Sequence, residues 1–508
     1  MCIMATKALF NTVVNWFIRQ RIDQIEHFIK YPVETQEGLL FSQLFHAEET
    51  EYGQKYGFSA ISNYRDFQKK VPIVCYEDFE PYIEKARQGC KDVFWPGLIK
   101  QFAKSSGTTN AKSKFIPISA ESLEDCHYKA GKDMVSIYVN NHPESELFQH
   151  KNLRLGGSAE MYQDFNTKFG DLSAILIENL PFWVEIINTP NKKISLMSEW
   201  ESKMRAIISE VRHDDVGSLT GVPSWMMVLL QRTLQETGRS NIAELWPNLE
   251  VFFHGGISFK PYKNQYKELI GKEIRYYEIY NASEGFFGIQ DQSGSDEMLL
   301  MLDYGIFYEF IPMDKFFSGV QEAIPISEVE LDKNYAVVIT TNGGLWRYLV
   351  GDTVKFTSIN PFRIKITGRT KHYINAFGEE LMIDNVETAL KQTCEKLDAN
   401  ISDYTGAPVF MTSDKKGCHE WIFEFPRKPA NIEEFTDIFD TALKCLNSDY
   451  EAKRYNDITL RRPVVYVAKP NLFYEWMASR GKLGGQNKVP RLSNDRQYID
   501  PLLELNKP

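Results

Sequence analysis

Long hydrophobic runs are absent from the sequence, and this absence excludes a helix that spans a membrane. Nowhere in its 508 residues does the chain contain the uncharged apolar stretch of roughly 20 residues that a bilayer requires. An excess of positive charge is also absent, because 58 Lys and Arg residues oppose 68 Asp and Glu residues and leave a net charge of -10. A protein that neutralises nucleic-acid phosphates needs the opposite balance. We therefore expect neither a membrane nor a nucleic acid as a partner.

Paired cysteines are missing as well. The seven cysteines are scattered and odd in number, and they contain no Cys-x-x-Cys pair that would indicate a metal or redox site. They predict reduced thiols in a cytoplasmic protein. The first residues lack a signal-peptide cleavage site, and a helical spacing of apolar residues there predicts an amphipathic helix docked on the core. These apolar residues are Leu9, Phe10, Val13, Phe17 and Ile18.

The pattern of the chain predicts a mixed α/β fold. Its hydrophobic share of 43% and charged share of 25% are those of ordinary globular proteins. Helical patterns dominate the first half, as in residues 221–238, where we expect Ser224 to cap a helix that Gly238 ends. Segments rich in β-branched and aromatic residues follow and predict strands. These segments are residues 249–256, 274–285, 297–313, 335–344, 345–356 and 362–369.

After Gly368 the order of elements changes, which predicts a second, smaller α+β domain of about 140 residues, a usual domain size. The expected elements are a helix (384–397), two strands (408–413 and 419–426), a helix (431–446), a strand (463–468), a final helix and a polar tail. We therefore divide the chain into a large mixed α/β N-terminal domain, residues 1–367, and a smaller α+β C-terminal domain, residues 368–508.

Residues 102–119, FAKSSGTTNAKSKFIPIS, combine hydroxyl side chains, a glycine and three lysines. Hydroxyl groups and backbone amides donate directionally to phosphate oxygens while lysines supply charge, so this composition suits a phosphate site. The spacing is not that of the common P-loop, G-x-x-x-x-G-K-[ST]. Taken alone, the same composition also describes a solvated surface turn, and both interpretations stay open for this stretch by itself.

Two further stretches place polar groups at the ends of expected strands, where open α/β sheets bind their ligands. They are YNASEG, residues 280–285, and LVGDTV, residues 349–354. Each has a plainer interpretation: Glu284 as a surface acid, Asp352 as a turn residue, Tyr280 as a core ring. Together with residues 102–119, they favour a nucleotide site.

In their order and separation, the three stretches resemble the nucleotide-binding motifs of the acyl-acid amido synthetases, the family whose plant members conjugate auxin and jasmonate to amino acids. That family is similar to the wider adenylate-forming superfamily of acyl-CoA ligases, adenylation domains and luciferase. The resemblance extends over nearly the whole chain and looks closest to the bacterial branch. Further matching stretches are residues 71–89, 246–256, 299–313 and 484–492.

This resemblance implies an ATP- and Mg²⁺-dependent ligase for small molecules. Such an enzyme activates a carboxylic acid as an acyl-adenylate, releases pyrophosphate and joins the acyl group to an amino acid as an amide. Hydroxyl and amide donors of the first stretch would surround the phosphates, with Lys112 or Lys114 supplying charge. These donors are Ser105, Ser106, Gly107, Thr108 and Thr109.

The second and third motifs receive roles from the same resemblance. Tyr280 would lie against the adenine, with Asn281 beside it in the nucleotide site. Ser283 would donate to the α-phosphate, and Glu284 would act in catalysis by holding Mg²⁺ through a hard carboxylate oxygen. Asp352 would accept hydrogen bonds from the ribose hydroxyls.

Residues 367–381, TGRTKHYINAFGEEL, resemble the superfamily's hinge. Gly368 and Arg369 would form the turn, and Arg369 and Lys371 would belong to the nucleotide site. The resemblance implies that the smaller domain is mobile and carries Lys488 to the reacting groups as the catalytic lysine. An ammonium that arrives only in the closed state stabilises the transition state rather than the ground state.

The acid-binding residues are less clear from the sequence. Trp225, Met226 and Val228, with the aromatic residues of 127–139, lie where the resemblance places the acyl pocket, although an apolar helix face is also typical of a core. His254 can contact a substrate or end a strand.

Two other functions stay open. An acyl-CoA ligase shares the adenylation step and uses a thiol acceptor. A non-catalytic nucleotide- or acid-binding relative is the second alternative, because Asn110 and Ala111 stand where relatives usually have glycine in the phosphate loop, and Ala tolerates a positive φ poorly. The sequence indicates neither the acid, the amine nor the oligomeric state.

Overall fold

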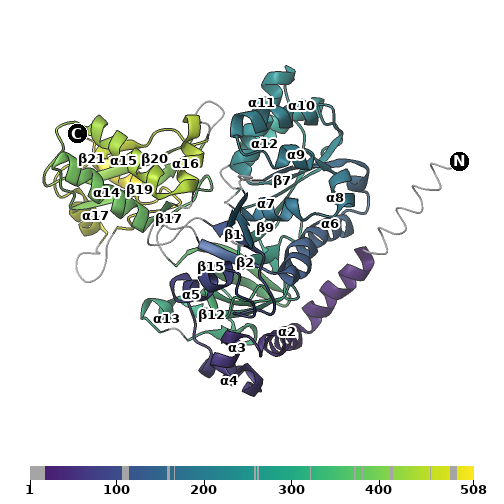
Figure 1. Cartoon of the computed structure of the whole chain (residues 1–508). Helices are drawn as coiled ribbons and strands as arrows, with labels where there is room; N and C mark the ends of the chain where they lie inside the picture. The colour runs from purple at the N-terminus through teal and green to yellow at the C-terminus, as the bar shows by residue number, and fades with distance from the viewer. Residues whose placement is uncertain are drawn as a thin grey trace.

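The computed structural model shows a large body and a smaller body (Figure 1). It describes residues 18–105, 114–156, 161–164, 166–256, 259, 262–320, 322–370, 373–379, 381–411, 416–457, 459–480 and 489–507. The large body is built on a twelve-stranded sheet, and the smaller one, in green and yellow in Figure 1, is built on a three-stranded sheet.

The large sheet changes from parallel to antiparallel pairing at one strand, β9. Its strands are, in spatial order, β13 (Ile324–Pro325), β12 (Ile306–Pro312), β14 (Asn334–Thr341), β15 (Tyr348–Ile359), β16 (Phe362–Arg369), β11 (Met298–Leu300), β10 (Gly285–Ile289), β9 (Arg275–Ala282), β8 (Val251–Gly255), β7 (Val216–Gly221), β3 (Lys151–Leu155) and β6 (Asn188–Thr189). The strands from β6 to β9 are parallel, and those from β9 to β13 are antiparallel. Every strand segment predicted between residues 249 and 369 contributes to this sheet.

A second sheet has four strands in the order β2 (Lys114–Ile118), β1 (Gln101–Ser105), β5 (Thr167–Gly170) and β4 (Met161–Asp164). β1 and β2 are antiparallel, and their register pairs Ser105 with Lys114. The phosphate-loop stretch of the sequence therefore begins and ends on two neighbouring strands.

Helices cover the large sheet (Figure 1). They are α2 (Pro32–Ala47), α3 (Glu51–Tyr56), α4 (Tyr64–Lys70), α5 (Tyr76–Arg87), α6 (Lys129–Asn141), α7 (Leu172–Glu178), α8 (Phe182–Ile186), α9 (Lys192–Ser195), α10 (Trp200–Val211), α11 (Pro223–Thr237), α12 (Lys263–Ile270) and α13 (Met313–Phe317). α11 ends at Gly238 as predicted, with φ of 65°. The predicted cap Ser224 is wrong, because Pro223 starts the helix and Val222 is its N-cap. Proline suits that first position since its φ is already helical.

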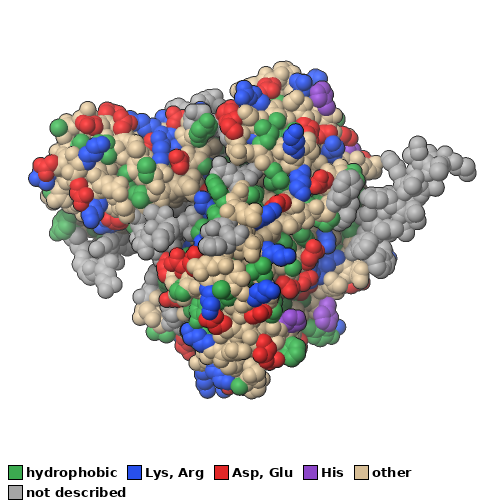
Figure 2. Space-filling view, in the orientation of Figure 1, with side chains coloured by type: hydrophobic (Ala, Val, Ile, Leu, Met, Phe, Trp, Pro, Cys, Tyr) green, Lys and Arg blue, Asp and Glu red, His purple; other side chains and the backbone are tan. Residues whose placement is uncertain are grey.

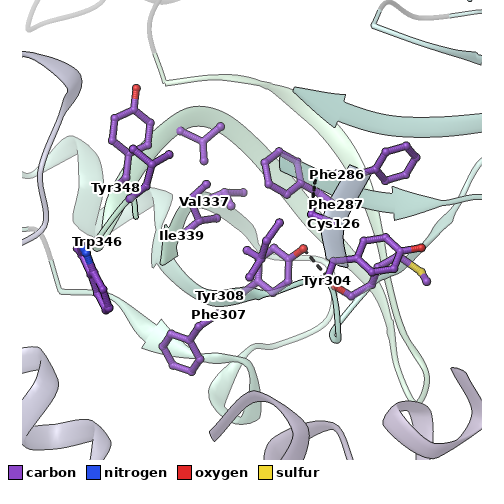
Figure 3. Close-up of a cluster of buried hydrophobic side chains, with 14 of the residues drawn as sticks. Cys126, Phe286, Phe287, Tyr304, Phe307, Tyr308, Val337, Ile339, Trp346 and Tyr348 are labelled. Atoms are coloured by element: carbon purple, nitrogen blue, oxygen red, sulfur yellow. Dashed lines mark hydrogen bonds between the residues drawn. The ribbon is translucent and has the colours of Figure 1, made fainter. Parts of the chain in front are cut away.

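The antiparallel half of the large sheet surrounds an aromatic core (Figure 3). Phe286 and Phe287 of β10, Phe307 and Tyr308 of β12 and Tyr348 of β15 are each at most 7% exposed. Because these rings come from strands that are far apart along the chain, their burial holds the sheet in its curled shape.

The smaller body has the strand order β19 (Asp403–Val409), β20 (Cys418–Glu424) and β21 (Val464–Val467). Its helices are α14 (Ile383–Leu397), α15 (Ile432–Leu446), α16 (Ser448–Arg454), α17 (Leu472–Ser479) and α18 (Ile499–Leu505). Two predictions were wrong here: the first strand ends at Val409 instead of beginning near it, and the polar tail contains a helix, α18. Leu502 of α18 is fully buried, which the surrounding polar residues concealed. The predicted boundary after residue 367 falls within the last residues of β16.

The surface charges are mixed in sign, and the described cysteines form no disulfide. Acidic and basic side chains are intermingled over the face shown in Figure 2. Among the described residues, no helix has both the length and the apolar composition needed to cross a bilayer. Six of the cysteines are described, and each is a free thiol.

The N-terminal helix is attached to the large body through a buried arginine. Residues 18–30 are helical; of the predicted apolar face, Ile18 is buried, whereas Leu9, Phe10, Val13 and Phe17 lie outside the described residues. In this helix Arg21 donates from Nε to Asp133 Oδ1 at 2.6 Å and from a terminal nitrogen to Asp303 Oδ2 at 2.7 Å.

Asp133 of α6 depends on this arginine because its carboxylate has no solvent exposure. The hydroxyl of Tyr304 also donates to Asp133, at 2.6 Å. A buried carboxylate that loses its cation keeps the desolvation cost without the compensating attraction.

We therefore expect Arg21→Ala to lower the free energy of unfolding by about 3–5 kcal/mol. Urea denaturation followed by circular dichroism measures this loss. Lys85→Ala is the control, because Lys85 forms an exposed ion pair with Glu51 and such pairs contribute at most about 1 kcal/mol. Equal denaturation midpoints for the two variants would contradict a stabilising role of the buried cluster.

Candidate active site

A cavity of about 1070 Å³ opens beside β9, the strand at which the large sheet changes from parallel to antiparallel pairing. Its wall includes residues of β9, β15 and α7, and residues of the smaller body such as Asn375 and Phe410. Six residues predicted to bind nucleotide or metal lie in this wall: Lys114, Tyr280, Asn281, Ser283, Glu284 and Asp352. The three sequence motifs to which these residues belong are more than 60 residues apart along the chain, and the fold brings them to one cavity.

A buried hydrogen bond joins two of these stretches. The Tyr280 hydroxyl donates to Asp352 Oδ2 at 2.7 Å, and both residues are nearly inaccessible to solvent. Asp352 follows Gly351, whose φ of 96° is a conformation that residues with a Cβ rarely adopt. The glycine therefore allows the turn of backbone that presents the carboxylate to the cavity.

Tyr348 of β15 interacts with both a cation and a carboxylate. Lys114 at the start of β2 donates from Nζ to the Tyr348 hydroxyl at 3.4 Å. Burial, and next the negative charge of Glu284, raise the pKa of Tyr348 well above its ordinary value. Ser283 and Glu284 occupy the tight turn between the paired residues Ala282 and Gly285. This end of the cavity thus carries a positive and a negative group within reach of one ring.

The remaining predicted residues are described only in part or not at all. Ser105 ends β1 and Arg369 ends β16 opposite Asp352 in the register, but their side chains are not described. Outside the described residues lie Ser106, Gly107, Thr108, Thr109, Asn110, Ala111, Lys112, Lys371 and Lys488.

The described residues contain no cluster of three or more His, Cys, Asp or Glu side chains suited to a metal ion. Mg²⁺ does not need one, because it is commonly held by one or two carboxylates together with substrate phosphates and water. The Glu284 carboxylate in the cavity wall fits that arrangement.

Comparison with known proteins identifies the family. The profile of the GH3 family N-terminal domain matches residues 21–274, that of the GH3 family central domain matches residues 299–369, and that of the GH3 family C-terminal domain matches residues 384–497. The chain belongs to the GH3 family. The resemblance inferred from the sequence motifs is thereby confirmed, while its assignment to a bacterial branch stays a prediction.

Named relatives of this GH3 chain are synthetases. Jasmonoyl-L-amino acid synthetase JAR6 of Nicotiana attenuata is 26% identical over an alignment of 404 residues, which covers 66% of this chain and 68% of the relative. The solved structure of AtGH3.15 acyl acid amido synthetase in complex with 2,4-DB covers 96% of both chains at 18% identity, with a TM-score of 0.62. A structure of 2-hydroxyisobutyryl-CoA ligase with 2-HIB-AMP and CoA covers 92% of this chain and 90% of that chain at 15% identity, with a TM-score of 0.59. These likenesses confirm the predicted fold class, a large mixed α/β N-terminal domain followed by a smaller C-terminal one.

Two of the residues considered for an acyl pocket belong to the core of this GH3 chain. Met226 and Val228 of α11 are buried in a hydrophobic cluster, and the Trp225 ring packs against Lys453 at 3.7 Å from its centroid. The apolar part of the cavity wall includes Leu172 and Leu176 of α7, with Phe259, Ile274 and Phe410 from other segments. The periodic pattern of α11 could not distinguish a core face from a pocket face.

Tyr348 is the functional candidate that sequence reasoning missed. A tyrosine within an apolar strand resembles any core ring, and Tyr348 is indeed fully buried. No local signal was available, because an irregularity near Gly351 interrupts the strand alternation between Tyr348 and Asp352.

His254 of β8 lines the cavity and stays neutral. It is 3% exposed, and its ring stacks on Phe259 with centroids 4.2 Å apart. Burial lowers the pKa of His254 from 6.5 to about 3. The Nδ1 atom is buried without a hydrogen-bond partner. His254 therefore acts as a neutral ring at physiological pH and is unsuited to the role of general base.

We expect acid to destabilise the protein through His254. Below pH 6.5 the unfolded chain binds a proton at this residue while the folded chain does not, so stability falls as the pH decreases toward 3. At pH 5 the cost is about 2 kcal/mol. The drop in Tm between pH 7 and pH 5 should therefore be smaller in His254→Phe than in wild type.

His213→Phe is the control for this measurement, since His213 is exposed. It should show the wild-type dependence on pH. An unchanged pH dependence in His254→Phe would show that His254 is protonated in the folded protein.

Proposed function

We propose that this GH3 protein is an ATP-dependent acyl-acid amido synthetase. It activates a carboxylic acid as an acyl-adenylate with release of pyrophosphate, and it transfers the acyl group to the amine of an amino acid. The main support is the joining of Tyr280 to Asp352 in one cavity wall with Lys114, Ser283 and Glu284. The synthetase names of its relatives support the same reaction.

The cavity wall supplies a position for each part of ATP. Asp352, which already accepts from Tyr280, is proposed to accept also from a ribose hydroxyl, and the adenine is proposed to lie against the Tyr280 ring. Lys114, with the residues of 105–113, neutralises the phosphates. Glu284 holds Mg²⁺, which supplies charge stabilisation at the phosphates. The proposed site also includes Asn281, Arg369 and Lys371.

Catalysis in this proposal is electrostatic. An anionic carboxylate attacks the α-phosphorus of a polyanion, so the attack needs cations and donors placed where negative charge increases. Ser283 donates to the α-phosphate, and Lys114 stays within reach because the Tyr348 hydroxyl accepts from it. Lys488 completes the set when the smaller domain, residues 368–508, closes on the larger one, residues 1–367. The free thiols fit the cytoplasmic location that we also propose.

Pyrophosphate exchange tests the adenylation step. We expect exchange of labelled pyrophosphate into ATP to require Mg²⁺ and a suitable acid, and to fall at least about 100-fold in Glu284→Gln and in Lys488→Ala, because each removes a charge that the transition state needs.

The controls are Glu322→Gln, at an exposed residue, and Lys482→Ala, at a lysine near Lys488 in the sequence; both should exchange at the wild-type rate. Wild-type exchange rates in both site variants would refute the assigned roles. No exchange in wild type with any acid would favour the alternative of a non-catalytic binding protein.

Acyl-CoA formation is the second candidate, because the chain also shares its fold with a CoA ligase. We expect a screen of acids against amino acids and coenzyme A, read by mass spectrometry, to yield amides with amino acids. Thioester products without amides would replace the proposed acceptor with coenzyme A while leaving the adenylation step in place.

A further inference from the structure

We propose that Lys263, at the N-terminus of α12, binds the carboxylate of the acceptor amino acid. This inference rests on the proposed amido synthetase function and assigns one end of its second substrate. Lys263 lines the same cavity as Glu284 and Asp352. No part of the proposed ATP site uses it.

The charges in the cavity wall distinguish Lys263 from the other basic residues. The wall is rich in acids: Glu77, Glu273, Glu278, Glu284, Asp296 and Asp352. Arg275 is paired with Glu144 at 2.7 Å and Lys365 with Asp296 at 2.5 Å, while Lys114 is placed at Tyr348. Among the described residues, Lys263 forms no ion pair, so its charge is available to an anionic ligand.

Lys263 lies where both bodies contribute to the cavity. Next to it, the Tyr262 hydroxyl donates to the backbone oxygen of Ala376 in the smaller body at 2.8 Å. Gln265 donates in the same way to the backbone oxygen of Met411. These contacts hold the first turn of α12 at the junction, so an acceptor that enters between the bodies meets Lys263.

The first turn of α12 adds to the attraction for a carboxylate. Backbone N–H groups at the start of a helix have no partners within the helix, and together with the helix dipole they favour an anion. Lys263 begins α12, so its ammonium and these amides can act on the same anion. A cation and directional donors together match the two oxygens of a carboxylate.

His254 provides an independent sign of a ligand beside this turn. Its ring stacks on Phe259, whose backbone oxygen accepts from the amide of Tyr262 at 2.9 Å. A proton on the buried Nδ1 would be an unsatisfied donor, which costs more than a bare lone pair in a dry site. The favoured tautomer therefore carries its proton on Nε2, and His254 contributes a neutral ring to the cavity wall.

The size of the cavity accommodates two substrates at once. Its volume of about 1070 Å³ lies at the upper end of the range of about 300–1,000 Å³ that is usual for ligand pockets. An acyl-adenylate at Tyr280 and Asp352 thus leaves space for an amino acid at the junction.

Lys263→Ala tests this inference through acceptors that differ in charge. We expect the KM for the amino acid to rise at least about tenfold, the usual effect of losing a hydrogen bond to a charged group. Pyrophosphate exchange with the acid alone should keep the wild-type rate. Hydroxylamine, an amine without a carboxylate, should trap the acyl-adenylate as a hydroxamate equally well in both proteins.

Two matched comparisons test whether Lys263 acts on the carboxylate of the acceptor. Wild type should prefer alanine to alaninamide, and Lys263→Ala should lose that preference. Lys267→Ala is the control variant, since Lys267 lies one turn along the same helix and pairs with Glu273; it should behave as wild type.

Several outcomes would overturn the inference. An unchanged KM for alanine in Lys263→Ala would exclude a role in acceptor binding. A higher KM for ATP with no effect on alanine would assign Lys263 to the nucleotide. If wild type showed no exchange with any acid, the proposed function itself would fail, and the inference with it.

Discussion

The hydrogen bond between Tyr280 and Asp352 depends on the curvature of the whole sheet. Three strands, β10, β11 and β16, separate β9 from β15 in the sheet order, yet the two side chains lie 2.7 Å apart. A flat sheet would hold such strands about 19 Å apart, because neighbouring strands are spaced by roughly 4.8 Å. Only a strongly curled sheet brings them together, and the aromatic core inside the curl stabilises that shape. The proposed nucleotide site therefore depends on the packing of β10, β12, β14 and β15.

The arrangement of the strands also determines which acidic and basic side chains line the cavity. An acidic wall suits the activation of an anion only if cations are placed at particular points, because unscreened carboxylates would repel both ATP and the acid. In the proposed mechanism the basic residues of the wall have two kinds of role: Arg275 and Lys365 pair with neighbouring acids, whereas Lys114 serves the phosphates and Lys263 serves the acceptor. Selectivity for two anionic substrates thus arises from the spacing of a few cations and does not require a basic protein.

Much of the fold could be predicted from the sequence, because strands with β-branched and aromatic residues are strong local signals. β8 and β9 lie within predicted segments, and most residues of β14 and β15 fall in theirs. Helix capping at Ser224 failed because Pro223 competes for the same turn, and α18 was missed because its seven residues form only about two turns and follow a polar stretch. For the site, the motif residues Tyr280 and Asp352 were found by resemblance, but their direct hydrogen bond was not foreseen. Tyr348 and Lys263 were missed, since their importance depends on contacts between distant segments that no local pattern records.

The fluorescence of Trp225 depends on a contact at the junction of the two bodies. The Lys453 ammonium of α16 lies 3.7 Å from the centroid of this ring in α11, and a charge so close to an indole shifts its emission by acting on the excited-state dipole. The ring belongs to the large body and the charge to the small one. Trp225 is one of nine tryptophans, so the difference in emission between wild type and Trp225→Phe isolates the signal that reports the contact between the bodies.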